Sequence, residues 1–81
     1  MESRVALLGI VVENEAAVDQ LNALLHQYRQ WIIGRMGLPY QKRKISIISV
    51  AVDAPQDIVS ALSGKLGRLP GVSTKTLYSK I

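Results

Sequence analysis

Residues 44–52 read Lys-Ile-Ser-Ile-Ile-Ser-Val-Ala-Val, and this stretch decides the fold. Its β-branched residues and its length are typical of a strand. Residues 5–12, Val-Ala-Leu-Leu-Gly-Ile-Val-Val, form a second run of the same kind. Apolar side chains occur at both alternating sets of positions in each run, so both faces of these strands need cover. The two runs are therefore predicted to be the central strands of a sheet.

Two amphipathic helices are predicted, one after each of these strands. The first covers roughly residues 14–30: Asn14 is a good N-cap, Glu15 suits the first turn, and the apolar residues that follow have helical spacing. Asp53-Ala54-Pro55 opens the second helix, because proline is well tolerated at the first helical position, and Pro70-Gly71 ends it. The predicted apolar stripes are Val18, Leu21, Leu25 and Tyr28 in the first helix and Ile58, Leu62, Leu66 and Leu69 in the second.

Two further strands complete the pattern. Residues 31–38 carry β-formers interrupted by two glycines and lead into a turn over residues 39–42, and residues 72–80 alternate like a half-exposed edge strand. The order β-α-β-β-α-β predicts an α+β, ferredoxin-like sandwich: a four-stranded antiparallel sheet with two helices on one face. We expect residues 1–81 to be one domain of this kind.

The second face of the predicted sheet raises the question of what covers it. With both helices on one side, one of the two apolar rows of each central strand would lie bare on the other. The tail after Tyr78 is too short to be the preferred cover. We therefore predict a homodimer or homotetramer formed through this sheet face.

Composition excludes several classes of function. The 81 residues are 48% hydrophobic, carry a net charge of +4 and include no cysteine, which rules out thiol chemistry and iron–sulfur ligation. The basic run at residues 42–44 is too short to indicate a nucleic-acid patch, and no apolar stretch is long enough to span a membrane. The start of the chain lacks the layout of a signal peptide, so a soluble, cytoplasmic protein without direct nucleic-acid or membrane contacts is expected.

No catalytic arrangement emerges from the remaining residues. The predicted central strands carry no aromatic side chain on which an RNA base could stack, and the acidic segment 13–15 would repel a phosphate. His26 could be a metal ligand or a general base, but it has no carboxylate partner on the adjacent turns, and we favour a solvated or interfacial histidine. The acids of segment 13–15 more often serve a helix N-terminus than form a paired-carboxylate site. We therefore predict a non-enzyme without a metal or another cofactor.

The glycine-flanked arginine at position 35 is the strongest candidate for a binding site. A strand gains from Gly34 and Gly37 only where something approaches closely. Arg35 would then donate to a carboxylate or a phosphate, with Tyr40 as a flanking wall. The alternative is a bulged edge strand at a subunit contact, where Arg35 pairs with an acid of a neighbour. We take Arg35, Gly37 and Tyr40 as the candidate effector contacts.

Several segments together resemble the small family of iron-only hydrogenase system regulators, whose members are similar to a free-standing ACT-like domain and to the C-terminal domain of the nickel-responsive regulator. The distinctive segments are Ile-Gly-Arg-Met-Gly at residues 33–37 and Gly-Lys-Leu-Gly-Arg-Leu-Pro-Gly-Val at residues 64–72. Further matching segments are residues 8–13, 25–28, 38–40 and 45–50. The nickel site of that regulator needs several histidines and a cysteine, so it cannot be carried over to a chain with one histidine and no cysteine.

The resemblance implies a ferredoxin-like fold, association through the sheet and a regulatory role. By analogy with ACT-like domains, where effectors sit near the first strand-to-helix loop, Gly9 and Asn14 are weaker candidate contacts. Our first hypothesis is an oligomeric, non-enzymatic regulator that binds a small effector at a subunit interface and shifts the population of its assemblies. The alternative is a structural module that docks on a hydrogenase or on a maturation protein.

Overall fold

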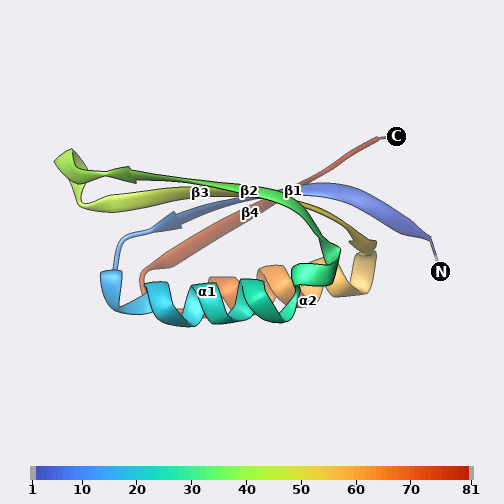
Figure 1. The fold of residues 1–81 in the computed structure, drawn as a ribbon, viewed down its shortest axis with the longest axis horizontal. Coiled ribbons are helices and arrows are strands. Elements are labelled where there is room, and N and C mark those ends of the chain that lie inside the picture. Colours follow the sequence, from blue (N-terminus) through green and yellow to red (C-terminus); the bar gives the residue numbers. More distant parts are fainter. Residues whose placement is uncertain (1, 81) are drawn as a thin grey trace.

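The computed structural model describes residues 2–80 and confirms the ferredoxin-like α+β architecture. The strands form one antiparallel sheet in the order β2-β3-β1-β4. Helices α1 and α2 both lie beneath this sheet, and its upper face carries no helix (Figure 1). The elements in chain order are β1 (Ser3–Val12), the 3-10 turn η1 (Glu15–Ala17), α1 (Val18–Gln27), η2 (Arg29–Trp31), β2 (Ile32–Tyr40), η3 (Gln41–Arg43), β3 (Ile45–Pro55), α2 (Gln56–Gly67) and β4 (Val72–Tyr78).

The core lies between the sheet and the two helices. The alternate residues of β1 and β3 that face the helices are buried, and Leu8 and Val50 are fully so. From below, α1 contributes Leu21 and Leu25, and α2 contributes a buried stripe of its own. The two runs that decided the fold are thus the central strands, as predicted, and they pair antiparallel over their whole length.

The structure corrects three predicted boundaries. The α-helix predicted over residues 14–30 is shorter, because a 3-10 turn flanks α1 at each end; Asn14 caps the first of these by accepting a hydrogen bond from the Ala16 amide at 3.0 Å. Strand β2 continues through Pro39 to Tyr40, which proline tolerates on an edge strand. Strand β3 likewise continues to Pro55, whose ψ of 148° is extended, so this residue precedes α2 instead of opening it.

The buried stripe of α2 also differs from the predicted one. Leu62 and Leu66 are buried as expected, but Val59 joins them, while Ile58 and Leu69 are only partly buried. Val59 and Ile58 lie three and four residues before Leu62, so both are near the buried face of the helix, and Val59 is the more central of the two.

The Leu-Pro-Gly-Val segment, residues 69–72, forms the turn that follows α2. Gly71 adopts a φ of +73°, in the left-handed region that favours glycine. Its carbonyl accepts a hydrogen bond of 2.7 Å from the Glu13 amide, and a Cβ on Gly71 would lie 2.6 Å from Cβ of Asn14. This turn therefore fixes the loop that follows β1.

Candidate functional site

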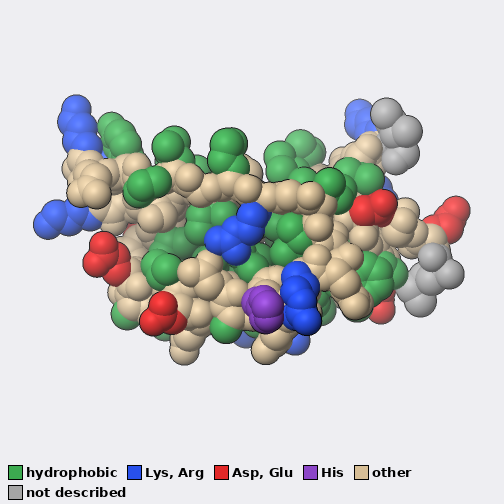
Figure 2. Space-filling model, viewed as in Figure 1, with side chains coloured by type: hydrophobic (Ala, Val, Ile, Leu, Met, Phe, Trp, Pro, Cys, Tyr) green, Lys and Arg blue, Asp and Glu red, His purple; other side chains and the backbone are tan. Residues whose placement is uncertain are grey.

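The upper face of the sheet is strongly apolar. Met36 is 70% exposed, Leu77 is 69% exposed and Leu7 is 43% exposed. Figure 2 shows a row of hydrophobic side chains along this face, on the side of the molecule opposite the helices. We call the following residues the open face: Val5, Leu7, Ile33, Met36, Leu38, Tyr40, Ile47 and Leu77.

Nothing within residues 2–80 folds back over the open face. After β4, the chain continues alongside β1, where the Ser79 amide donates a hydrogen bond of 2.8 Å to the Val5 carbonyl. Gly9 lies at the centre of the same face, paired with Ser49 and Lys75 of the flanking strands. A Cβ on Gly9 would meet only the Lys75 carbonyl oxygen, at 3.9 Å, so the chain's own packing does not demand a glycine there.

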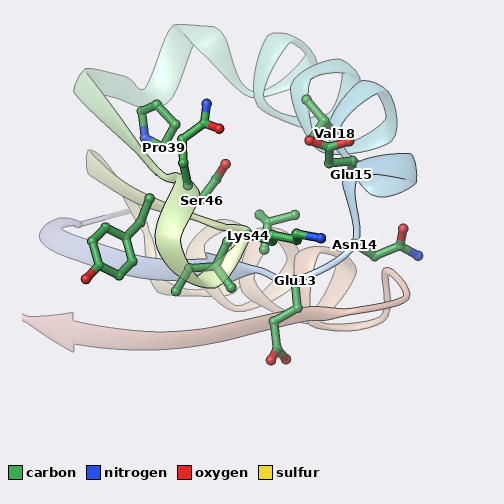
Figure 3. A pocket seen from close by; sticks show the side chains of 11 residues that line it. Glu13, Asn14, Glu15, Val18, Pro39, Lys44 and Ser46 are labelled. Carbon is green, nitrogen blue, oxygen red and sulfur yellow. The ribbon is translucent and has the colours of Figure 1, made fainter.

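A cavity of about 580 Å³ lies at one end of the sheet, where β1 leaves it and β2 turns into β3. The loop after β1 contributes Glu13, Asn14 and Glu15, and the β2–β3 turn contributes Tyr40 and Lys44. Lys44 takes a left-handed conformation with a φ of 54°, which closes the turn. In Figure 3 its side chain extends toward the loop that carries Asn14, while the Glu13 carboxylate points away from it. The cavity lining therefore includes one cation and two acidic residues, and the cavity volume is within the range of small-molecule sites.

A second, smaller hollow of about 320 Å³ lies on the flank between α1 and β2. Arg35 faces the helix layer there and donates a hydrogen bond of 3.0 Å from its guanidinium to Oδ1 of Asn22. His26, from the end of α1, and Arg29, from η2, line the same hollow. Two guanidinium groups and an imidazole thus share one small surface depression.

The predicted site residues fall into separate places. Asn14 and Tyr40 line the cavity together, Arg35 lines the hollow, and Gly9 lies on the open face. Gly37 pairs with Ile48, and a Cβ there would be 4.0 Å from the Ile48 side chain. Arg35 and Tyr40 are on opposite faces of β2, so a single copy of the chain does not bring them together. The predicted effector contacts stay predictions.

The glycines of β2 are accounted for only in part. The register shifts between Ile32 and Gly34, which agrees with the bulge that the alternative interpretation of this strand expects. A Cβ on Gly34 would meet no atom within 4 Å. Any close approach that explains Gly34 must therefore come from outside this copy of the chain.

Sequence reasoning did not select two of the residues that line these sites. The sequence shows Lys44 only as part of the short basic run 42–44, whereas the structure places it in the cavity lining, at the left-handed end of the turn. The helical spacing of Asn22, His26 and Arg29 puts these three residues on one polar side of the first helix. That spacing does not show that Arg35 of β2 meets them there.

The described part of the chain holds neither a cluster of metal ligands nor a membrane-spanning helix. Among residues 2–80, no three histidine, cysteine, aspartate or glutamate side chains gather closely enough to hold a metal ion. Neither helix within these residues is both long and apolar enough to cross a bilayer.

Comparison with known proteins decides the family. The model of the TM1266-like family, described as "Iron-only hydrogenase system regulator, putative", matches residues 4–76. The chain belongs to this family. The structure of the uncharacterized protein TM1266 from Thermotoga maritima is 40% identical, with a TM-score of 0.94, and the match covers 98% of this chain and 100% of that one. The resemblance stated from the sequence is confirmed.

More distant structures share the fold alone. The C-terminal domain of the MgtC protein from Mycobacterium tuberculosis is 12% identical, with a TM-score of 0.75, and the match covers 96% of this chain and 89% of that domain. A formyltetrahydrofolate deformylase from Pseudomonas putida KT2440 is 11% identical, with a TM-score of 0.64, over 90% of this chain and 28% of the enzyme. A comparison with curated proteins finds no match.

Proposed function

We propose that this member of the TM1266-like family is a non-enzymatic regulatory domain that associates with itself through the open face and binds a small effector in the cavity at Asn14 and Tyr40. One observation carries the proposal: Tyr40 belongs to the cavity lining and also to the open face. A ligand that orders Tyr40 would change the surface presented to a second copy. Effector binding and association would then be linked without any catalytic step.

The open face suits a second copy of the chain. An exposed apolar surface of this kind usually marks an interface. Four strands at about 4.8 Å spacing and about nine residues at 3.3 Å rise give a face of roughly 600 Å² in projection. This is of the same order as the roughly 800 Å² of surface that each partner buries in a standard interface. In a two-fold dimer the same face serves both partners.

The charges of the cavity favour a zwitterion over a simple anion. Glu13 and Glu15 repel anions, whereas Lys44 attracts a carboxylate, and no ion pair among the described residues ties Lys44 to either acid. A small molecule with one ammonium and one carboxylate would match both signs. Amino acids are therefore the first class to test, ahead of nucleotides and inorganic anions.

The experiment is a thermal-shift screen with native mass spectrometry on the parent and three variants. At a ligand concentration one hundred times its dissociation constant, binding should add about 2.7 kcal/mol, which is a shift of several degrees for a domain of this size. Lys44→Met should reduce the ligand-induced shift and leave association intact. Leu38→Ala should weaken association and keep the ligand shift, because Leu38 shares the open face but does not line the cavity.

Tyr40→Ala tests whether effector binding and association are linked, since it should weaken both the ligand-induced shift and the association of the chain. A ligand that stabilises Tyr40→Ala and Lys44→Met as much as the parent would place the effector outside this cavity. A parent that stays monomeric at every concentration and is stabilised by no ligand would favour the alternative function. That alternative is a module that docks on a hydrogenase or maturation partner. It would use the open face or the free edge of β2, where residues 33–40 are exposed.

A further inference from the structure

We infer that the hollow between α1 and β2 is an anion site for the phosphate group of a small molecule, held by Arg35 and Arg29. The site lies apart from the Asn14–Tyr40 cavity and shares no lining residue with it. The inference therefore stands or falls independently of the proposed function.

The charge of the hollow is uncompensated. No acidic residue lines it, and within residues 2–80 neither arginine makes an ion pair with a carboxylate. The helix cannot supply the attraction, because the C-terminal end of α1 carries the negative end of its dipole. Attraction for an anion must come from the two guanidinium groups, each of which keeps spare N–H donors. Figure 2 shows the histidine with basic side chains near it on this face of the molecule.

Both arginines are held in place by neutral partners. The Arg35 guanidinium donates to Asn22 at 3.0 Å, and the Arg29 guanidinium donates to the His26 carbonyl at 2.9 Å. Each bond uses one donor and restricts the side chain without cancelling its charge. The entropy cost of fixing two long side chains is thereby partly met before a ligand arrives.

The number of guanidinium groups favours phosphate over carboxylate. One arginine fork can engage both oxygens of a carboxylate, which leaves little for a second arginine. A phosphate group presents three or four oxygens and can accept hydrogen bonds from two guanidinium groups at once. The apolar side chains of Leu25 and Ile32 complete the hollow. Leu25 is buried in the core, so the partly buried Ile32 provides the apolar contact for a small group attached to the phosphate.

The test is a titration of the ¹⁵N-labelled protein followed by NMR, at constant ionic strength. The probes are inorganic phosphate, phenyl phosphate and acetate. We expect the amide shifts to concentrate within residues 22–35, with phenyl phosphate bound more tightly than phosphate, and phosphate more tightly than acetate. Arg35→Ala and Arg29→Ala should each weaken phenyl phosphate binding about tenfold or more, because a charge-assisted pair of hydrogen bonds is lost.

Two variants keep the test specific. Arg43→Ala removes the same charge from the exposed β2–β3 turn and should leave the affinity within about twofold. Arg35→Lys keeps the charge but loses the planar fork, and it should still bind more weakly than the parent. If Arg43→Ala and Arg35→Ala weaken phenyl phosphate binding equally, the anion is attracted by the net charge of the protein and not by this hollow. That result, or a parent whose amides in residues 22–35 do not respond to phosphate, would overturn the inference.

Discussion

Replacing Leu7, in the middle of the open face, with lysine tests whether this face binds a second copy of the chain. Leu7 lies on β1 between Ala51 of β3 and Leu77 of β4, so any second sheet packed on this face must cover it. The leucine is 43% exposed in a single copy, which leaves room for a longer side chain. The lysine stem can keep most of the contacts of the leucine while its ammonium reaches water. The fold of one copy should therefore tolerate Leu7→Lys, whereas a dimer should not.

The size of the effect follows from that exposed fraction. Full burial of a leucine is worth about 1.5–3 kcal/mol, so covering the exposed 43% contributes roughly 1 kcal/mol per copy. In a two-fold dimer the loss counts twice, which alone weakens association about thirtyfold. Burying two unpaired ammonium groups costs several kcal/mol more. Association should thus weaken by at least about a thousandfold.

Sedimentation velocity over a concentration series measures this change directly. The matched control is Gln20→Lys, which adds the same charge on an exposed position of α1, away from the open face. Circular dichroism confirms that both variants fold. The parent and Gln20→Lys should sediment as oligomers at micromolar concentration, and Leu7→Lys should sediment as a monomer. Unchanged association of Leu7→Lys, or a monomeric parent, would refute the assignment of the open face to a second copy.

Two substitutions test the packing that holds the sites in place. Gly71→Ala should lower the free energy of unfolding by about 1–3 kcal/mol in urea denaturation, because its Cβ would be 2.6 Å from that of Asn14 at a φ of +73°. Gly34→Ala is its control and should cost less than about 0.5 kcal/mol, since no atom lies within 4 Å of the added methyl group. Leu66→Ala should cost about 2–5 kcal/mol, because Leu66 is fully buried beneath the sheet; a smaller loss in calorimetry would contradict its place in the core.

Most of the fold could be predicted because its decisive signals are local. The doubly apolar runs, the helical spacings and the glycine–proline punctuation each depend on neighbours within a few residues. The boundary errors at Pro39 and Pro55 have one cause. Proline suggests a turn or a helix start, but it is also compatible with an edge strand and with the last residue of a strand. The sheet pairing that decided both cases is not a local signal.

The sites could be predicted only in part because they depend on which face of a strand a residue takes. Arg35 and Tyr40 are five residues apart, so a strand that continues through both puts them on opposite faces. The predicted turn over residues 39–42 ended the strand before Tyr40 and left the direction of its side chain open. The register shift between Ile32 and Gly34 precedes both residues, and it sets only which of the two faces the helix layer.

The position of Tyr40 makes the proposed regulation reciprocal. If an effector in the cavity changes the association constant through Tyr40, association must change the effector's affinity by the same factor. Tyr40 is 43% exposed in a single copy and also lines the cavity, so a second copy on the open face would contact a residue of the cavity wall. Effector affinity should then depend on protein concentration in the parent and lose that dependence in Leu7→Lys, which has no partner. An affinity independent of concentration in both proteins would separate the cavity from the open face, even if each bound its own partner.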